Sequence, residues 1–168
     1  IWYRTRSGSH VDGRGKFAPH LLEEVYNLED ALVAAGFLNS FIRHADSVKI
    51  ANIAQIVNVI APILTRGDEM VLQTIFYPIE MYTKRRTGKA LRIAVEGSTY
   101  ESKQYGKVTH VDASAILNGK QLSVFAANRS VDKTIDLEVK LGDAQIAKLL
   151  NGECISGKDP KAANTFEN

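Results

Sequence analysis

Residues 48–64, VKIANIAQIVNVIAPIL, form a nearly uncharged, β-branched run that carries three amide side chains among its apolar residues. Such a continuous Val/Ile/Ala run is typical of a strand buried on both faces, as in a parallel sheet covered by helices. We therefore expect a buried strand here. Burying an amide without a partner costs about 1–3 kcal/mol. Gln55 must then be hydrogen-bonded, either by the protein, which is the commoner case, or by a molecule that enters a pocket.

The part of the chain around this strand is expected to be helical. Asn27 can cap a helix whose apolar residues recur at steps of three and four and form one stripe that packs on a sheet. The stripe consists of Leu28, Ala31, Leu32, Ala35, Leu38, Ile42 and Ala45. After the strand we expect a loop, TRGDEM at residues 65–70, and a second helix over about 74–86. Pro78 is tolerable in the first turn of that helix, and Gly88 is expected to stop it.

From Lys89 onward, short strand-like runs alternate with turn residues, which indicates an all-β segment. The runs are residues 91–100, 108–117, 121–130, 134–141 and 144–150. Asn118-Gly119 predicts a β-hairpin, because this dipeptide supplies the positive φ angles that a type I′ turn requires. We expect a sandwich-type domain that lacks the strands needed to close it. The change of pattern predicts a domain boundary, with one domain over 1–89 and another over 90–168.

Composition excludes several classes of protein. The chain is 45% hydrophobic and 24% charged, with a net charge of +2, as expected for a soluble globular protein. No apolar run reaches the roughly 20 residues of a membrane span, and the one basic cluster (Lys84, Arg85, Arg86) falls at an expected helix end, so neither membrane nor nucleic acid is an expected partner. The single cysteine, Cys154, and four scattered histidines do not resemble a metal site.

Several segments, in this order and spacing, resemble the C-terminal third of family 51 glycoside hydrolases, the intracellular α-L-arabinofuranosidases. The most specific are YNLEDAL (26–32), AQIVNVIAPI (54–63) and QTIFYP (73–78). IWYR at the start, SVFAANRS (123–130) and KAANTFEN (161–168) add to them, so the resemblance runs from residue 1 to residue 168.

The resemblance implies a fold that is α/β and then all-β. Residues 1–89 would be the last two βα units of a (β/α)₈ TIM barrel, since a whole barrel takes eight units over about 250 residues. Residues 90–168 would be an incomplete C-terminal β-sandwich of the jelly-roll type. The sequence would then be truncated at both ends, and its first partner would be the missing N-terminal barrel portion of the same protein.

The resemblance also implies an activity, the retaining hydrolysis of terminal non-reducing α-L-arabinofuranosyl residues from arabinan- or arabinoxylan-type oligosaccharides. Two glutamates perform this reaction, with their carboxyl groups about 5–5.5 Å apart. Ile1-Trp2-Tyr3 matches the last three positions of the nucleophile motif, so the nucleophile would lie three residues before Ile1. No catalytic residue is expected in this segment, which should be inactive alone. A cytoplasmic homo-oligomer without metal or organic cofactor is expected.

Three residues are expected to bind substrate. The resemblance makes Trp2 a wall of the sugar pocket, although a tryptophan of the barrel core or rim is the alternative. It places Gln55 at the C-terminal end of the eighth barrel strand, where it would hydrogen-bond a hydroxyl of the arabinose. Leu22 would line the pocket rim.

Other polar residues are expected to have structural roles. Asn52 and Asn58 are expected to orient the loop backbone near Gln55. The acidic residues before and in the first turn of the first helix (Glu23, Glu24, Glu29 and Asp30) are explained by the helix dipole rather than by a carboxylate pair.

Two other functions stay open. One is a noncatalytic carbohydrate-binding or assembly module in which the β-rich half is active. Few aromatic residues lie in that half, and Trp2 is the only tryptophan, which argues against a sugar-binding face there. The other is a glycosidase of the same family that cleaves a different bond.

Overall fold

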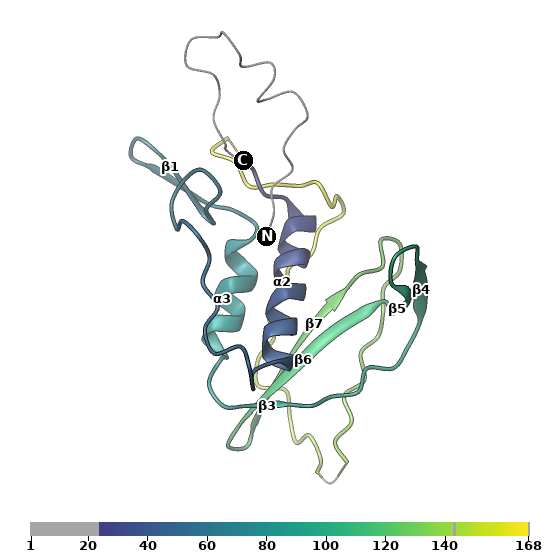
Figure 1. Cartoon of the computed structure of the whole chain (residues 1–168). Helices are drawn as coiled ribbons and strands as arrows, with labels where there is room; N and C mark the ends of the chain where they lie inside the picture. The colour runs from purple at the N-terminus through teal and green to yellow at the C-terminus, as the bar shows by residue number, and fades with distance from the viewer. Residues whose placement is uncertain (1–23, 143, 168) are drawn as a thin grey trace.

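The computed structural model describes residues 24–142 and 144–167 of the 168-residue chain (Figure 1). Two helices lie next to each other, and antiparallel strands complete a mixed α/β fold. The helices are α2 (Leu28–Arg43) and α3 (Phe76–Lys84). The strands are β1 (Ile63–Arg66), β2 (Glu69–Leu72), β3 (Lys89–Leu91), β4 (Thr99–Ser102), β5 (Gly106–Thr109), β6 (Val111–Asn118) and β7 (Gln121–Asn128).

Helix α2 confirms the prediction of a helix capped by Asn27. The Asn27 side chain accepts a hydrogen bond from the backbone N–H of Asp30 at 3.1 Å, and the Asp30 carboxylate accepts one from the backbone N–H of Asn27 at 2.9 Å. This reciprocal pair is a capping box, which satisfies two backbone donors at the start of the helix. Glu29 and Asp30 both lie in the first turn, where the helix dipole favours negative charge.

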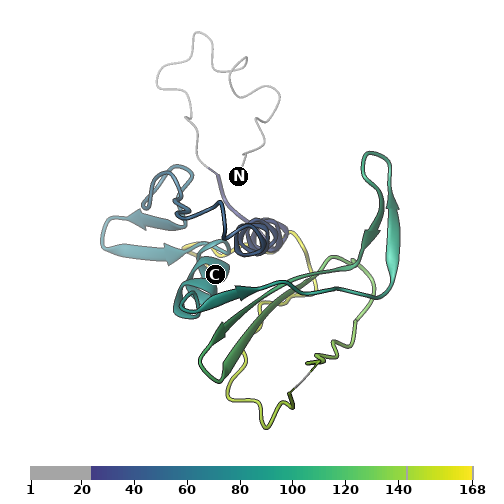
Figure 2. The ribbon, with the colours of Figure 1, turned by 60° about the horizontal axis from the view of Figure 1, so that its bottom comes forward.

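The larger sheet has the strand order β3-β6-β7, all antiparallel, while β4 and β5 pair separately as a hairpin. Helix α2 lies across one face of the larger sheet (Figure 2). Its apolar stripe packs there as predicted: a cluster of Tyr82, Ile116 and Phe125 is covered by Ala35, Leu38, Ile42 and Met81.

A buried polar network ties α2 to strand β6. Asn39 is completely buried, and its side-chain oxygen accepts hydrogen bonds from the hydroxyls of Tyr82 (2.8 Å) and Ser114 (2.6 Å). Its side-chain nitrogen donates to the Asp112 carboxylate at 2.9 Å, which also pairs with Arg43 at 3.0 Å. Because every member has a partner, this network sets the position of the helix on the sheet at little cost in desolvation.

The hairpin predicted at Asn118-Gly119 is confirmed, but its turn differs. Asn118 pairs with Gln121, so the two turn residues are Gly119 and Lys120. Only Gly119 of these two has a positive φ, at 58°. Type I′ requires positive φ at both turn residues, whereas a glycine in the first position alone fits type II′.

Helix α3 is shorter than predicted: it spans Phe76–Lys84 rather than about 74–86, so it ends before Gly88 can stop it. Pro78 does lie in its first turn, where it removes no intrahelical hydrogen bond. Gly88 has another role. Its φ is 131°, and a Cβ atom added there would lie 2.5 Å from the carbonyl oxygen of Leu117 in β6. Glycine therefore lets the chain pass close to the sheet as β3 begins.

The buried strand predicted over residues 48–64 is wrong for residues 48–62. This stretch is irregular apart from one bridge between Val57 and Ile63, and β1 begins only at Ile63. Ile50 and Ile56 are 76% and 68% exposed. A strand buried on both faces needs a hydrogen-bonded neighbour on each side, and none of the described strands pairs along this stretch. Residues 65–70, expected as a loop, belong instead to the β1–β2 hairpin.

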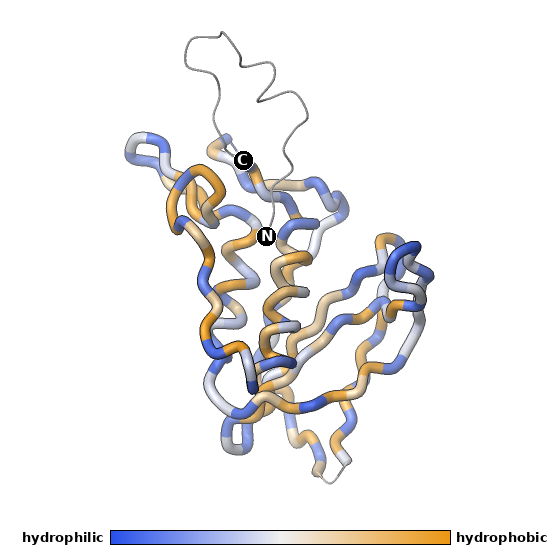
Figure 3. Tube along the Cα trace, viewed as in Figure 1, coloured by the Kyte–Doolittle hydropathy of each residue, from blue (hydrophilic) through white to orange (hydrophobic). Residues whose placement is uncertain are grey.

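The strands predicted over 134–141 and 144–150 are also wrong for the described residues, which are irregular there. The larger sheet ends at β7, so these runs have no partner strand despite their alternating pattern. Hydrophobic residues nevertheless continue through both irregular stretches (Figure 3). The described residues thus show a mixed α/β fold with antiparallel sheets; they do not show a barrel.

The C-terminal segment, residues 159–167, returns to the start of α2 (Figure 1). The backbone N–H of Leu28 donates to the carbonyl of Ala162 at 2.9 Å, so this segment satisfies a first-turn amide that has no intrahelical acceptor. The Asn164 side chain donates to the carbonyl of Leu72 at 2.8 Å. The two ends of the described chain are therefore held beside the same helix terminus.

Candidate functional site

Gln55 is the one predicted site residue that the structure describes, because Trp2 and Leu22 lie outside the described residues. The expectation that Gln55 is buried is wrong: it is exposed, in the irregular stretch after α2. Its side chain forms no hydrogen bond with another described residue. The amide can therefore bind an external group without breaking a contact within the described part of the protein.

The backbone around Gln55 is strained. The φ angles of Gln55, Asn58 and Val59 are 58°, 62° and 61°, and these are the non-glycine residues with positive φ in the described part of the chain. A β-branched residue such as Val59 is a real outlier in this region. Such a conformation costs about 1–3 kcal/mol, persists only where the surroundings impose it, and is found disproportionately at active sites and ligand clamps. We call residues 55–61 the Gln55 loop.

Asn58 holds the Gln55 loop against β1 through hydrogen bonds. Its side-chain oxygen accepts a hydrogen bond from the backbone N–H of Thr65 at 2.7 Å, and its side-chain nitrogen donates to the Thr65 hydroxyl at 2.9 Å. Its own backbone N–H donates to the carbonyl of Ile63 at 2.7 Å. Asn58 therefore orients the loop backbone, as expected from the sequence, whereas Asn52 forms no hydrogen bond with the other described residues.

Gln73 holds the other end of the loop. Gln73 lies between β2 and α3 along the chain, and its side chain is completely buried. The side-chain nitrogen donates to the carbonyl oxygens of Ala61 (2.7 Å) and Glu24 (3.2 Å). Its oxygen accepts a hydrogen bond from the backbone N–H of Tyr26 at 2.8 Å. One amide thus joins the end of the Gln55 loop to the segment that leads into α2.

Two further hydrogen bonds reach the loop from the same segment. The backbone N–H of Glu24 donates to the carbonyl of Val59, and the Tyr26 hydroxyl donates to the carbonyl of Ile60, both at 2.9 Å. Burial raises the pKa of the Tyr26 hydroxyl, and the nearby carboxylates of Asp30 and Glu24 raise it further. The phenol therefore remains protonated and keeps donating at neutral pH.

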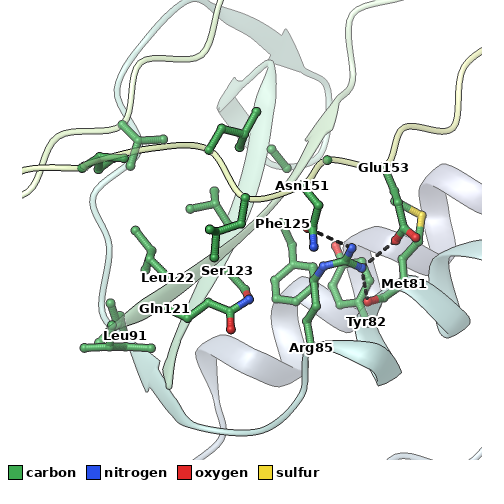
Figure 4. A pocket seen from close by; sticks show the side chains of 18 of the residues that line it. Met81, Tyr82, Arg85, Leu91, Gln121, Leu122, Ser123, Phe125, Asn151 and Glu153 are labelled. Atoms are coloured by element: carbon green, nitrogen blue, oxygen red, sulfur yellow. Dashed lines mark hydrogen bonds and ion pairs between the residues drawn. The ribbon is translucent and has the colours of Figure 1, made fainter. Parts of the chain in front are cut away.

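A groove of about 1130 Å³ lies apart from the Gln55 loop, between the two helices, β7 and the irregular residues 139–142 and 144–155 (Figure 4). Tyr82 and Phe125 stack in it with their ring centroids 4.2 Å apart. Arg85, which lines the groove, donates to the Glu153 carboxylate at 2.6 Å and to the carbonyl of Met81 at 3.1 Å.

The groove does not have the chemistry of a glycosidase centre. Glu153 supplies the one carboxylate among its described lining residues, and that carboxylate is already neutralised by Arg85. In addition, no group of three or more His, Cys, Asp or Glu side chains in residues 24–142 and 144–167 could hold a metal ion. Because the groove lacks a free carboxylate among its described lining residues, the Gln55 loop is the candidate site.

No helix of the described chain is long and apolar enough to cross a membrane.

Sequence reasoning missed Gln73, although it lies in the QTIFYP segment. The available signal was an amide placed directly after the apolar pair Val71-Leu72 and before a helix start. A buried amide there needs partners for its two N–H donors and its oxygen, and backbone groups of Glu24, Tyr26 and Ala61 provide them.

Comparison with known proteins confirms the resemblance over the whole chain. The model of the family described as "Alpha-L-arabinofuranosidase C-terminal domain" matches residues 1–168. An intracellular exo-α-(1→5)-L-arabinofuranosidase of Streptomyces lividans is 36% identical over 99% of this chain and 26% of its own length. An exo-α-(1→6)-L-arabinofuranosidase of Bifidobacterium longum is 34% identical over 99% of this chain and 33% of its own length. The chain thus spans about a third or less of these relatives.

Solved structures agree. The family 51 α-L-arabinofuranosidase AbfB of Bifidobacterium longum aligns with a TM-score of 0.71 and 30% identity, over 90% of this chain and 30% of that one. An α-L-arabinofuranosidase from Thermotoga maritima, solved as an arabinose complex, aligns with a TM-score of 0.56 and 26% identity, over 67% of this chain and 26% of that one. The chain therefore belongs to the α-L-arabinofuranosidase C-terminal domain family and corresponds to the C-terminal portion of family 51 enzymes.

Proposed function

We propose that this chain is the C-terminal part of a retaining α-L-arabinofuranosidase that removes terminal non-reducing α-L-arabinofuranosyl residues from arabinan- or arabinoxylan-type oligosaccharides. The relatives named exo-α-(1→5)- and exo-α-(1→6)-L-arabinofuranosidase support this class of substrate. Several of these relatives are named intracellular, which supports a cytoplasmic enzyme. The catalytic glutamates belong to the polypeptide that precedes Ile1 in this proposal.

The proposed architecture is the end of a (β/α)₈ barrel over residues 1–89 and a jelly-roll β-sandwich over residues 90–168. The exposed apolar residues of the irregular stretch 48–62 support the barrel assignment, because neighbouring barrel strands would cover them. Exposed residues such as Leu149 (84%) support a second sheet over the β-rich half in the same way.

The observation that carries the proposed role of this chain is the Gln55 loop, a strained backbone held on two sides whose amide forms no hydrogen bond with the other described residues. In a retaining mechanism, one carboxylate attacks the anomeric carbon while the other protonates the leaving oxygen and later activates water. An amide donates or accepts a hydrogen bond without changing charge, so it can orient a sugar hydroxyl without competing with these carboxylates. Gln55 has this role in our proposal, with Trp2 as a wall of the pocket and Leu22 at its rim.

Gln55→Ala in the full-length enzyme tests this role. We expect kcat/KM for a nitrophenyl α-L-arabinofuranoside to fall by roughly 10- to 200-fold, equivalent to about 1.5–3 kcal/mol, because the substitution leaves a sugar hydroxyl unpaired in a desolvated pocket. The melting temperature should remain the same, because the side chain forms no hydrogen bond with another described residue.

Gln104→Ala is the matched control, since Gln104 is also an exposed glutamine, in the turn between β4 and β5. Both kcat/KM and the melting temperature should be unchanged in that variant. A Gln55→Ala enzyme with normal kinetics would remove Gln55 from the substrate site. A full-length wild-type enzyme that does not release arabinose from any arabinofuranoside would overturn the proposed function itself.

A further inference from the structure

Gln73 connects the two segments that carry the candidate site. Through Glu24 and Tyr26 it holds the segment that leads into α2, and through Ala61 it holds the end of the Gln55 loop. Three of the four hydrogen bonds that an amide can make are formed here, because both nitrogen-bound hydrogens and the oxygen point at backbone groups. The side chain is completely buried, so water cannot replace any of these partners.

The position of Gln73 is itself fixed by the fold. Its backbone N–H donates to the carbonyl of Pro62 at 2.8 Å, and its carbonyl accepts from the N–H of Phe76 at the start of α3 at 2.9 Å. Helix α3 packs in turn on α2. Gln73 therefore transmits the position of the two helices to the Gln55 loop.

The strain in the loop makes this connection important. Among the described residues, Val59 and Ile60, which precede Ala61, are held through their carbonyl groups, by Glu24 and Tyr26. If the tie from Gln73 is lost, Val59 can relax to the negative φ that a β-branched residue prefers. Relaxation at this point would rotate the chain that leads back to Gln55, four residues earlier in the sequence.

We propose that Gln73 is a positioning residue for the glycosidase reaction, one that acts on substrate through the placement of Gln55. This inference rests on the proposed function of the Gln55 loop. Gln73 does not touch substrate in this proposal. Its effect on turnover must therefore depend on the presence of the Gln55 side chain.

Gln73→Met tests the proposal, because methionine keeps the approximate volume of glutamine but has no amide. In the full-length enzyme we expect kcat/KM to fall by roughly 10- to 100-fold, as for a displacement of a substrate-positioning group by about 1 Å. In a Gln55→Ala background the same substitution should change kcat/KM by less than about 2-fold, since residues that act as one unit are not additive. The melting temperature should fall equally in both backgrounds.

Tyr26→Phe is the milder variant. If the Gln73→Met enzyme does not fold, Tyr26→Phe still tests whether the ties to the Gln55 loop affect kcat/KM through Gln55. It removes the hydrogen bond to Ile60 and leaves the buried ring in place. We expect a loss in kcat/KM of about 3-fold, as for one neutral hydrogen bond, and we expect this loss to disappear in the Gln55→Ala background. Equal fold losses in both backgrounds, for either variant, would overturn the positioning role and leave Gln73 with a stabilising role only.

Hydrogen–deuterium exchange gives a second readout that does not depend on activity. Gln73→Met should speed exchange of the amides in residues 55–61. Ser114→Ala is the control, because it removes an equally buried hydrogen bond, to Asn39, at the distant α2–β6 interface. That control should lower the melting temperature and leave both kcat/KM and exchange in the Gln55 loop unchanged.

The outcomes separate the two proposals. Unchanged exchange in residues 55–61 of the Gln73→Met enzyme would overturn the positioning role even if arabinofuranosidase activity is present. Faster exchange in an enzyme without arabinofuranosidase activity would leave the positioning of the loop intact and overturn the proposed substrate. A Gln55→Ala enzyme with normal kinetics would remove both the substrate contact and the effect of Gln73 on turnover.

Discussion

Gly88 lies where the chain leaves α3 and passes over the end of β6. A Cβ atom at this position would lie 2.5 Å from the carbonyl oxygen of Leu117 and 2.9 Å from the Ile116 side chain. The φ angle of 131° is also one that other residues rarely adopt. Both the space and the backbone conformation therefore require glycine here.

We expect Gly88→Ala to destabilise the protein by at least about 1–3 kcal/mol, the usual cost of a strained backbone residue, because relief of the clash with Leu117 would require β6 to move. Gly36→Ala provides the opposite case. Gly36 lies within α2, and a Cβ atom there meets nothing within 4 Å. That change should stabilise the helix by about 0.5–1 kcal/mol.

Thermal unfolding of both variants, followed by circular dichroism in the full-length enzyme, measures these effects. The melting temperature should fall for Gly88→Ala and rise for Gly36→Ala. An unchanged melting temperature in Gly88→Ala would mean that the chain does not approach β6 as closely as the structure shows.

For individual residues, the sequence predicts position better than conformation. Asn27 could be recognised as a cap because its partner, Asp30, lies three residues away and the interaction is local. The surroundings of Gln55 could not be predicted in this way. Gln55 lies in a loop whose end is held by Tyr26 and Gln73, which are distant in sequence, so an apolar local pattern wrongly indicated burial.

Helix α2 begins with two kinds of capping. The side chain of Asn27 satisfies the N–H of Asp30, while the carbonyls of the C-terminal segment satisfy the N–H groups of Leu28 and Glu29. Together these contacts provide acceptors for three first-turn donors. The start of the helix is therefore also the anchor of residues 159–167.

We expect Asn27→Ala to lower the free energy of unfolding by about 0.5–2 kcal/mol, the range for loss of an N-cap side chain. Asn27→Asp is the control, because aspartate is an equally good cap and its charge is favourable at a helix start. Melting temperatures of the two variants should differ clearly, with Asn27→Asp close to the wild type. Equal losses in both would contradict the capping role.

The contact between α2 and the sheet should become weaker at alkaline pH. Burial raises the pKa of the Tyr82 hydroxyl above its usual value of 10.0, the Asp112 carboxylate raises it further, and Arg43 opposes this. Since the folded-state pKa is the higher one, the stability from the neutral phenol is complete below pH 10 and is lost as the pH rises toward the folded-state pKa. Each pH unit in that window should remove up to about 1.4 kcal/mol.

Tyr82→Phe tests this pH dependence. At pH 7 the variant should be less stable by about 0.5–1.5 kcal/mol, because the hydrogen bond to Asn39 is lost. Above pH 10 the difference from the wild type should shrink, since phenylalanine does not titrate and the raised pKa of Tyr26 affects both proteins equally. Urea midpoints measured from pH 7 to pH 11 give the comparison, and a constant difference would contradict the prediction.

The helices could be predicted from the sequence and several strands could not, for a physical reason. The apolar stripe of α2 is a property of one segment, and its hydrogen bonds close within the helix. Strands depend on partners. Residues 48–62 and 134–150 have strand-like composition, but apart from the single Val57–Ile63 bridge no strand of the described fold pairs with them. The hairpin of β6 and β7 was predictable because each strand supplies the partner of the other.

Large apolar residues are exposed at several places on the molecule. They include Ile50 (76%), Ile56 (68%), Val131 (92%), Leu149 (84%) and Leu150 (60%). They lie in the irregular stretches on both sides of the helix–sheet core (Figure 3). Exposed apolar surface at this scale marks interaction surfaces or causes aggregation.

The chain spans 26% and 33% of the length of the two relatives described above, so the N-terminal portion of a full-length enzyme is the proposed cover for this surface. We expect residues 1–168, expressed alone, to self-associate in size-exclusion chromatography and to bind a dye specific for apolar surface. The same residues within the full-length enzyme should elute as one defined species and bind little dye.

Activity should likewise differ between the isolated chain and the full-length enzyme. The 168-residue chain alone should hydrolyse no nitrophenyl α-L-arabinofuranoside, because a contact such as Gln55 binds substrate but supplies no nucleophile. Co-expression with the N-terminal portion as a separate chain should restore both solubility and turnover, since burial of the exposed apolar residues would drive the two chains together. Hydrolysis by the isolated chain, or a monodisperse and cooperatively melting monomer of it, would show that the missing portion is not what completes the fold and the site.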